Sequence, residues 1–198
     1  GPGDVFLDIG GHIGLFAVVG ARLVGGSGQV FSFEPTPFTR SILTQTVALN
    51  GCKDIVEVRP EAVSSMRGEA EFFDTGDEAS NANSLAPIKA AVGSITVPTI
   101  SIDEFVEERQ ILPNCIKIDV EGAELEVLRG AKEVIKKFRP SIRLGLHPQQ
   151  MVANGDGLKD VWDILRDFGL TPHSDGSPMY LDDFCSKSDL FDVNLEYD

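Results

Sequence analysis

The chain has 198 residues, of which 42% are hydrophobic, and it carries a formal net charge of −14. This length and apolar content suffice for one α/β domain with a substantial core, so we predict a single domain over residues 1–198. The acidic excess argues against nucleic acid and anionic membrane surfaces as partners, because Lys and Arg are the side chains that bind phosphates.

The three cysteines are far apart and lack the spacing of metal ligands. No apolar run approaches the roughly 18 residues of a membrane-spanning helix, and no basic and apolar leader stands at the start of this sequence. We therefore expect a cytoplasmic protein with reduced thiols. A first predicted strand that begins almost at the first residue also suggests that the natural protein extends further upstream.

A glycine-rich turn follows the first predicted strand. Residues 5–14 read VFLDIGGHIG, and an apolar-periodic segment follows, which predicts strand, turn and helix. In the dinucleotide fingerprint G-x-G-x-x-G, backbone N–H groups hold a pyrophosphate, but with Gly10 as its first glycine the next positions are His12 and Leu15. A carboxylate at Asp8 instead suits a ligand with positive charge. S-adenosylmethionine has an ammonium, a sulfonium and no phosphate.

The following elements extend this pattern. A strand predicted at residues 29–33 ends at Glu34, and dinucleotide-type folds place an acidic residue against ribose hydroxyls about 20 residues after the glycines. Thr36–Pro37 predicts the start of a helix. A third strand, residues 55–59, leads into the segment Glu61–Val63.

The middle of the chain is less regular. Residues 70–73 predict an edge strand, and Pro98 restricts the strand predicted at residues 95–100 to an edge or an irregular piece. The polar segment 74–86 cannot build a core, so it is either a surface loop or part of a substrate lid. The capping-box pattern at residues 101–104 then opens a short helix.

Acidic residues also follow a later strand. Residues 115–120 predict a strand with Asp119 and Glu121 at its end, and helical periodicity continues from there to Phe138. The remaining predicted elements are a strand at 142–146 that ends at His147, a helix at 158–168, a hairpin from 171 to 181 and a last strand at 190–197.

Strands that alternate with helices predict a mostly parallel sheet with helices on both faces. Ligands of such sheets bind beyond the C-terminal ends of the strands. Six polar residues are predicted at those ends and are expected to share one cleft: Asp8, Glu34, Glu61, Asp119, Glu121 and His147.

The segments 6–14 (FLDIGGHIG), 33–37 (FEPTP) and 116–124 (IKIDVEGAE), in this order, resemble the FkbM-type class I methyltransferases. The resemblance runs from about residue 3 to residue 148. It implies a three-layer, Rossmann-like α/β fold with a mostly parallel seven-stranded sheet. It also implies S-adenosylmethionine as cofactor and O-methylation of a hydroxyl on a sugar or small natural product. His12 departs from the family pattern, in which asparagine is usual.

Carried over by position, the resemblance implies cofactor contacts from each motif. Asp8, Gly10, Gly11, His12, Ile13 and Gly14 would surround the methionine part, Glu34 and Pro35 would lie at the ribose, and Glu61, Ala62 and Val63 would lie near the adenine. Asp119 and Glu121 would face the methyl group and the acceptor, with Asp119 also a cofactor contact.

An alcohol that accepts a methyl group must lose its proton. His147 is a candidate general base, because an imidazole titrates near neutral pH, but it can equally be a histidine hydrogen-bonded at a strand-to-loop corner. Asp119 or Glu121 can act as base or hold the acceptor. With Glu61 and His147 they also offer ligands for Mg²⁺ or Mn²⁺. Glu121 can instead merely receive backbone N–H groups at the start of a helix.

Two other functions stay open from the sequence. One is a nicotinamide-dependent oxidoreductase, against which the displaced glycines argue. The other is a non-catalytic module that binds S-adenosylmethionine, since a fold alone does not establish activity. The expected partner is a small-molecule or glycosidic acceptor, whose identity the sequence leaves open.

Overall fold

The computed structural model describes residues 1–74 and 93–198. From residue 75 onward, the segment predicted as a surface loop or lid lies outside these described residues. Within them, no helix is long and apolar enough to cross a membrane.

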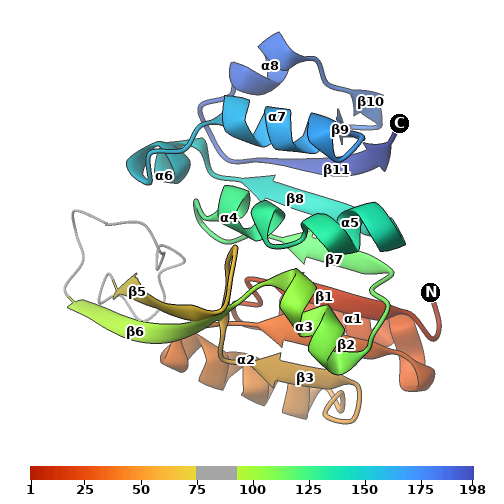
Figure 1. Cartoon of the computed structure of the whole chain (residues 1–198). Helices are drawn as coiled ribbons and strands as arrows, with labels where there is room; N and C mark the ends of the chain where they lie inside the picture. Colours follow the sequence, from red (N-terminus) through yellow and green to blue (C-terminus); the bar gives the residue numbers. More distant parts are fainter. Residues whose placement is uncertain (75–92) are drawn as a thin grey trace.

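The main sheet has eight strands among the described residues, in the order β10-β9-β11-β8-β7-β1-β2-β3 (Figure 1). They are β1 (Val5–Ile9), β2 (Gln29–Phe33), β3 (Val56–Arg59), β7 (Cys115–Ile118), β8 (Ser141–Leu146), β9 (Leu170–Ser174), β10 (Ser177–Pro178) and β11 (Phe191–Tyr197). The five strands from β3 to β8 are parallel, whereas β11 is antiparallel to both of its neighbours. The predicted mostly parallel sheet is confirmed, and the two-residue β10 adds an eighth strand to the seven expected.

Helices cover both faces of this sheet (Figure 1). They are α1 (Leu15–Val24), α2 (Pro37–Leu49), α3 (Ile102–Arg109), α4 (Glu124–Arg129), α5 (Lys132–Phe138), α6 (Pro148–Ala153), α7 (Leu158–Asp167) and α8 (Leu181–Cys185), with a 3₁₀ turn, η1 (Gly25–Ser27). Side chains of α1 and α2 pack with Phe6 and Val30 in one apolar cluster, and those of α3, α4, α5 and α7 pack with Leu7 and Phe31 in another. Successive strand residues point to opposite faces, so the strands fill both layers.

A second, three-stranded sheet has the order β4-β6-β5, formed by β4 (Ala62–Val63), β5 (Gly68–Asp74) and β6 (Gly93–Ile100). The prediction that Pro98 restricts its strand to an edge or an irregular piece is wrong, because β6 pairs regularly with β5 and is the central strand of this sheet. The proline is tolerated there because β4 pairs only with Thr99 and Ile100. Pro98 therefore lies outside the part of β6 that has partners on both sides.

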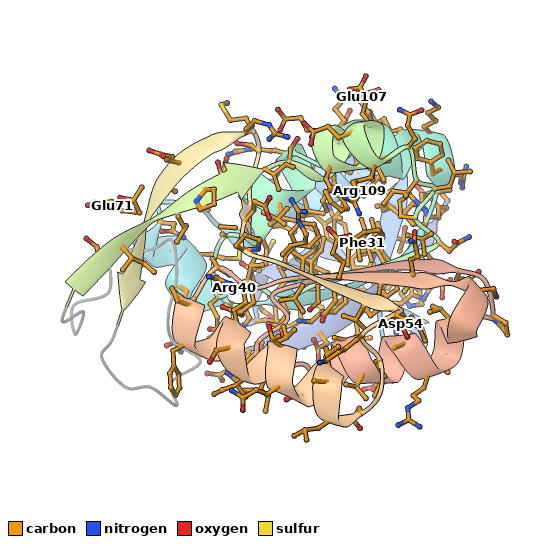
Figure 2. The ribbon with its side chains drawn as sticks, turned by 90° about the horizontal axis from the view of Figure 1, so that it is seen from below. Phe31, Arg40, Asp54, Glu71, Glu107 and Arg109 are labelled. Atoms are coloured by element: carbon orange, nitrogen blue, oxygen red, sulfur yellow. The ribbon has the colours of Figure 1, made fainter. Side chains whose placement is uncertain are left out.

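Helix α3 begins with the predicted capping box. Ser101 Oγ accepts a hydrogen bond from the Glu104 N–H at 3.2 Å, and the Glu104 carboxylate accepts one from the Ser101 N–H at 3.1 Å. At the other end of the helix Arg109 lies over the ring of Phe31, 5.3 Å from its centroid. Figure 2 shows Arg109 reaching from α3 toward Phe31 while Glu107 points away from the core.

Three features differ from the predicted elements. The helix expected up to Phe138 is broken into α4 and α5 at Gly130, where a Cβ would lie 2.2 Å from the Ser64 carbonyl oxygen. The second strand of the C-terminal hairpin is formed by residues 177–178, which pair with β9, and not by residues 179–181. Two short helices that were not expected, α6 and α8, follow His147 and Tyr180.

Candidate functional site

A cavity opens where the strand order of the main sheet reverses direction. From β1 the chain continues to β2 and β3 on one side, whereas β7 is followed by β8 on the other side. The connections that leave the C-terminal ends of β1 and β7 therefore run in opposite directions, and the crevice between them is the usual ligand site of such sheets. The cavity is lined by Ile9, Gly10, Gly11, His12, Ile13, Leu15, Phe16, Phe33, Glu34, Pro35, Thr36, Thr39, Glu61, Ala62, Val63, Lys117, Asp119, Val120, Glu121 and Ala123.

The glycine turn after β1 is enclosed on both sides. The N–H groups of Gly10 and Gly11 both donate to the Phe33 carbonyl oxygen, at 3.1 and 2.8 Å. Gly10 has φ +80°, and a Cβ there would lie 1.9 Å from the Asp119 carbonyl oxygen. A Cβ at Gly11 would lie 2.1 Å from Ser32 Oγ. Glycine is therefore required at both positions for the backbone to fit between β2 and β7.

Glu34 is fastened at the end of β2 by backbone groups. One carboxylate oxygen accepts the N–H of His12 at 3.0 Å, and the other accepts the N–H of Thr36 at 2.9 Å. Arg40 donates to the carbonyl oxygens of Glu34 and Pro35 at 2.9 and 2.7 Å. The carboxylate is buried and lies at the cavity wall, where its orientation is set before any ligand binds.

The next part of the wall comes from the segment after β3. Glu61 forms an ion pair with Arg59 of β3, which also pairs with Glu57. Ala62 and Val63 of β4 add buried apolar surface to the same side of the cavity. This side combines a fixed carboxylate with an apolar wall, an arrangement that suits a flat heterocycle with polar edges.

Asp8 lies behind the glycine turn and does not line the cavity. Its side chain has no exposed surface; Oδ2 accepts a hydrogen bond from Ser32 Oγ at 2.8 Å, and Oδ1 lies 3.6 Å from Lys117 Nζ. Burial raises the pKa of Asp8, although Lys117 and the Ser32 hydroxyl act in the opposite direction. The structure thus places Asp8 as the counter-ion of a buried lysine.

Lys117, on β7, was not anticipated as a site residue. Its Nζ donates to the Gly10 carbonyl oxygen at 2.6 Å, lies 3.5 Å from Asp119 Oδ2, and lies 5.3 Å from the centre of the Phe16 ring. The register pairs Asp8 with Ser32 on one side and with Lys117 on the other, so the three form a polar row on one face of the sheet. Each of these residues sits between apolar neighbours in its strand, and this shared pattern was the available signal.

Asp119, Glu121 and His147 converge at the ends of β7 and β8. The imidazole Nε2 lies 3.5 Å from Asp119 Oδ1 and 3.4 Å from Glu121 Oε2, and Nδ1 lies 2.7 Å from Glu124 Oε1. Burial alone would lower the pKa of His147, but the hydrogen bond with Glu124 and the nearby carboxylates raise it above its usual value. Burial likewise raises the pKa of Glu121.

Most residues predicted to bind a ligand are therefore brought to one cavity, and three lie just outside its wall. Asp8 is behind the turn, and His147 is 5% exposed and sits behind Asp119 and Glu121. Gly14, with φ +93°, precedes α1, and a Cβ there would lie 3.4 Å from the side chain of Leu43 on α2. Its place in the fold is at the contact between two helices.

The strand order, the glycine turn and the buried carboxylate after β2 are together those of an α/β protein with the class I methyltransferase fold. Residues 8–170 match the methyltransferase FkbM domain family, and the chain belongs to this family. The predicted family resemblance is thus confirmed.

The chain is similar to a curated protein and to solved structures. Over 152 residues it is 32% identical to the hexuronic acid methyltransferase AglP of Haloferax volcanii, a match that covers 75% of this chain and 59% of that protein. The chain therefore spans less than two thirds of the length of this relative.

Two solved structures show the likeness of the fold. One is a methyltransferase FkbM from Methylobacillus flagellatus, with a TM-score of 0.60, 15% identity, and coverage of 97% of this chain and 42% of that one. The other is an S-adenosylmethionine-dependent O-methyltransferase from Thermotoga maritima, with a TM-score of 0.56, 12% identity, and coverage of 99% and 60%. They confirm the predicted three-layer class I methyltransferase fold.

Proposed function

We propose that this chain binds S-adenosylmethionine and transfers its methyl group to a hydroxyl oxygen of a sugar. The observation that carries the proposal is the cavity between the glycine turn and Glu34, at the point where the strand order reverses. The name of the Haloferax relative, a hexuronic acid methyltransferase, supports a sugar acceptor. Uronic acids and their glycosides are therefore the acceptors to test first.

The residues present fit this cofactor. Gly10 and Gly11 line the cavity, and their lack of side chains lets the turn pack between β2 and β7 at the cavity wall. Glu34 uses one lone pair of each carboxylate oxygen on a backbone N–H, so each oxygen keeps acceptor capacity for a ribose hydroxyl. Asp119, whose side chain is 41% exposed, is the carboxylate best placed to balance a positive charge in the cavity.

Asp8 has a positioning role in this proposal. Its charge is already opposed by Lys117, and Lys117 in turn holds the Gly10 carbonyl oxygen. The pair keeps the turn against β7 without contacting the ligand. The sequence suggested that Asp8 favours a cationic ligand. In this proposal Asp119, on the other side of Lys117, has that role instead.

When bound, S-adenosylmethionine supplies a methyl group carried by a sulfonium. The acceptor oxygen forms a bond to the methyl carbon, the carbon–sulfur bond breaks with its electron pair left on sulfur, and the hydroxyl proton must leave. We assign Glu121 to accept that proton, because its carboxylate lines the cavity and is 24% exposed. His147 lies behind Glu121, with its Nε2 3.4 Å from Oε2 of that carboxylate.

Apolar side chains at the cavity rim offer a surface for the acceptor. Ile13, Leu15 and Phe16 line the cavity and are 45%, 65% and 40% exposed. A sugar ring presents C–H groups on its faces, and an aromatic ring such as that of Phe16 can pack against them. The rim therefore complements an acceptor that has both apolar faces and hydroxyl groups.

Calorimetric titration with S-adenosylhomocysteine tests the cofactor part. We expect binding by the unmodified chain and a loss of about tenfold to a hundredfold in affinity for Glu34→Gln, since hydrogen bonds to a charged group contribute about 1.5–3 kcal/mol. Glu196→Gln, an exposed change on β11, is the matched control and should bind normally. If the unmodified chain fails to bind S-adenosylhomocysteine, the proposed function is wrong.

Methyl transfer is then measured with labelled S-adenosylmethionine and a panel of uronic acids and glycosides. Glu121→Gln should keep S-adenosylhomocysteine affinity and lose most of kcat, because the change removes a proton acceptor and no cofactor contact. Cofactor binding without transfer to any acceptor would favour a non-catalytic module. Binding of NADH in place of S-adenosylhomocysteine would favour an oxidoreductase.

A further inference from the structure

We propose that Asp119, Glu121 and His147 form a binding site for a divalent cation, with Mn²⁺ as the ion that their donor atoms fit. One donor atom from each residue can be chosen so that all three lie within 4.8 Å of one another. The residues come from the adjacent ends of β7 and β8, so the sheet itself sets their spacing. Asp119 and Glu121 face the cavity, which leaves room for water or an acceptor oxygen on the open side.

The orientation of His147 is the observation that separates this cluster from an ordinary group of acidic residues. The imidazole is 5% exposed, and its Nδ1 lies 2.7 Å from Glu124, a carboxylate with no exposed surface. A carboxylate accepts hydrogen bonds, so Nδ1 donates this one, and in the neutral imidazole that binds metals the lone pair of Nε2 points at the cluster. Histidine ligands of metals are held by a carboxylate in this way.

The distances around Nε2 also fit a shared ion better than a direct contact. Nε2 makes no hydrogen bond with any described residue, and it lies 3.4 and 3.5 Å from the two carboxylates. Ligands at about 2.0–2.2 Å from one tetrahedral or octahedral ion lie about 3.0–3.5 Å from each other. The nitrogen is thus spaced from each of the two carboxylates as one ligand of a cation is from another.

The backbone fixes Glu121 in the cluster. Glu121 has φ +54°, and Gly122 follows with φ +103°. Helix α6 packs closely on this turn, because a Cβ at Gly122 would lie 2.6 Å from Gln150 Cβ, and Asn154 donates to the Gly122 carbonyl oxygen at 2.9 Å. The backbone that carries Glu121 therefore does not need to reorganise when an ion binds.

Negative charge in this region exceeds the positive charge that the described residues supply. Asp119, Glu121 and Glu124 surround the imidazole, and Asp8 lies nearby on the other side of Lys117. Lys117 is the ammonium in contact with this group of described carboxylates, and it is shared between Asp8 and Asp119. A divalent cation would offset charges that are costly to hold close together in a partly buried site.

The donor set selects among cations. Carboxylate and water ligands suit Mg²⁺, Ca²⁺ and Mn²⁺, whereas imidazole suits transition metals, so one imidazole with two carboxylates favours Mn²⁺. The contribution of the ion to methyl transfer rests on the proposed function. Glu121 would bind the ion through Oε2 and keep Oε1 for the proton, while an acceptor hydroxyl on the ion would lose that proton more readily.

The test measures Mn²⁺ binding to the whole chain by calorimetry and by electron paramagnetic resonance, with no acceptor present. We expect one bound ion and a spin-echo modulation from one imidazole nitrogen. His147→Asn should lose that signal and weaken binding at least tenfold, and Glu121→Gln should also weaken it. Glu124→Gln, which releases the imidazole without removing a ligand, should cost about tenfold to a hundredfold.

His173→Asn is the matched control, because His173 also lies beside a carboxylate, Glu196, at 3.6 Å but on β9 and β11. It should bind Mn²⁺ as the unmodified chain does. The proposal is overturned if the unmodified chain binds no Mn²⁺, if the bound ion shows no imidazole nitrogen, or if His147→Asn and Glu121→Gln bind as well as His173→Asn. Mn²⁺ binding in a chain that does not bind S-adenosylhomocysteine would keep the cation site and reject the proposed function.

Discussion

Replacing Gly10 with alanine tests how tightly the glycine turn is enclosed. The added Cβ would lie 1.9 Å from the Asp119 carbonyl oxygen, which is a backbone atom and cannot rotate away. The left-handed conformation, φ +80°, costs an alanine about 1–2 kcal/mol, and forcing packed backbones apart typically costs about 1–3 kcal/mol more. We expect Gly10→Ala to lower the free energy of unfolding by about 2–5 kcal/mol and to weaken S-adenosylhomocysteine binding.

Gly51→Ala separates the two contributions. Gly51 has a similar left-handed conformation, φ +69°, just after α2, but a Cβ there would meet no atom within 4 Å. It should cost only the conformational part, about 1–2 kcal/mol, and leave ligand binding unchanged. Urea denaturation of both variants gives the comparison. Equal losses of stability would mean that the turn can move away from β7 at little cost, and the argument that it is rigidly enclosed would be refuted.

Four other substitutions test separate parts of the structure. Lys117→Met leaves the buried Asp8 carboxylate without its cation, so it should lower the free energy of unfolding by about 3–5 kcal/mol at neutral pH. The loss should be smaller at acidic pH, where Asp8 takes up a proton, and denaturation at both pH values checks this. Ser101→Ala removes the cap of α3 and should cost about 1 kcal/mol in the same assay, with Ser186→Ala, at an exposed position after α8, as a control that costs little. His12→Asn should raise stability slightly, by up to about 1 kcal/mol, because asparagine tolerates the positive φ of this position, and thermal unfolding that shows a loss would contradict it. Burial raises the pKa of Tyr197 to about 12, against the opposing effect of Arg139. Its contribution to stability is therefore complete below its unfolded pKa of about 10 and is lost as the pH rises toward 12, so Tyr197→Phe should show a shallower alkaline loss of unfolding free energy than the unmodified chain.

The strand ends and their acidic residues were predictable because each depends on a local pattern. The apolar run before Asp8, the position of Glu34 after the second strand and the cluster at Asp119 and Glu121 could all be located from a few neighbouring residues. The C-terminal ends of parallel strands meet by topology, so these local observations were enough to predict a shared cleft. The split of one helix at Gly130 was harder to locate, because the carboxylate that accepts the N–H groups at the start of α5 belongs to Asp103, a residue distant in sequence.

The assignment of side chains within the cleft needed information that one strand does not contain. His147 directly follows β8, and Asp119 directly follows β7, so from the sequence either side chain can contact a ligand. In the structure Pro148 begins a helix at once, and the imidazole is turned inward to the buried Glu124. The imidazole therefore contacts carboxylates and does not line the cavity, which is why we give the proton-accepting role to Glu121.

The polar row shows how far sequence reasoning could have been extended. In β1, β2 and β7, Asp8, Ser32 and Lys117 each alternate with apolar residues, so each must lie on the face opposite to its neighbours. What the sequence lacks is the register that sets Lys117 directly beside Asp8. Once that register is known, the carboxylate that looked like a ligand contact becomes the partner of a buried ammonium, because an unpaired charge at that depth would be far more costly. In the proposed function, Asp119, which shares the same lysine but faces the cavity, is therefore the carboxylate that we assign to balance the charge of the cofactor.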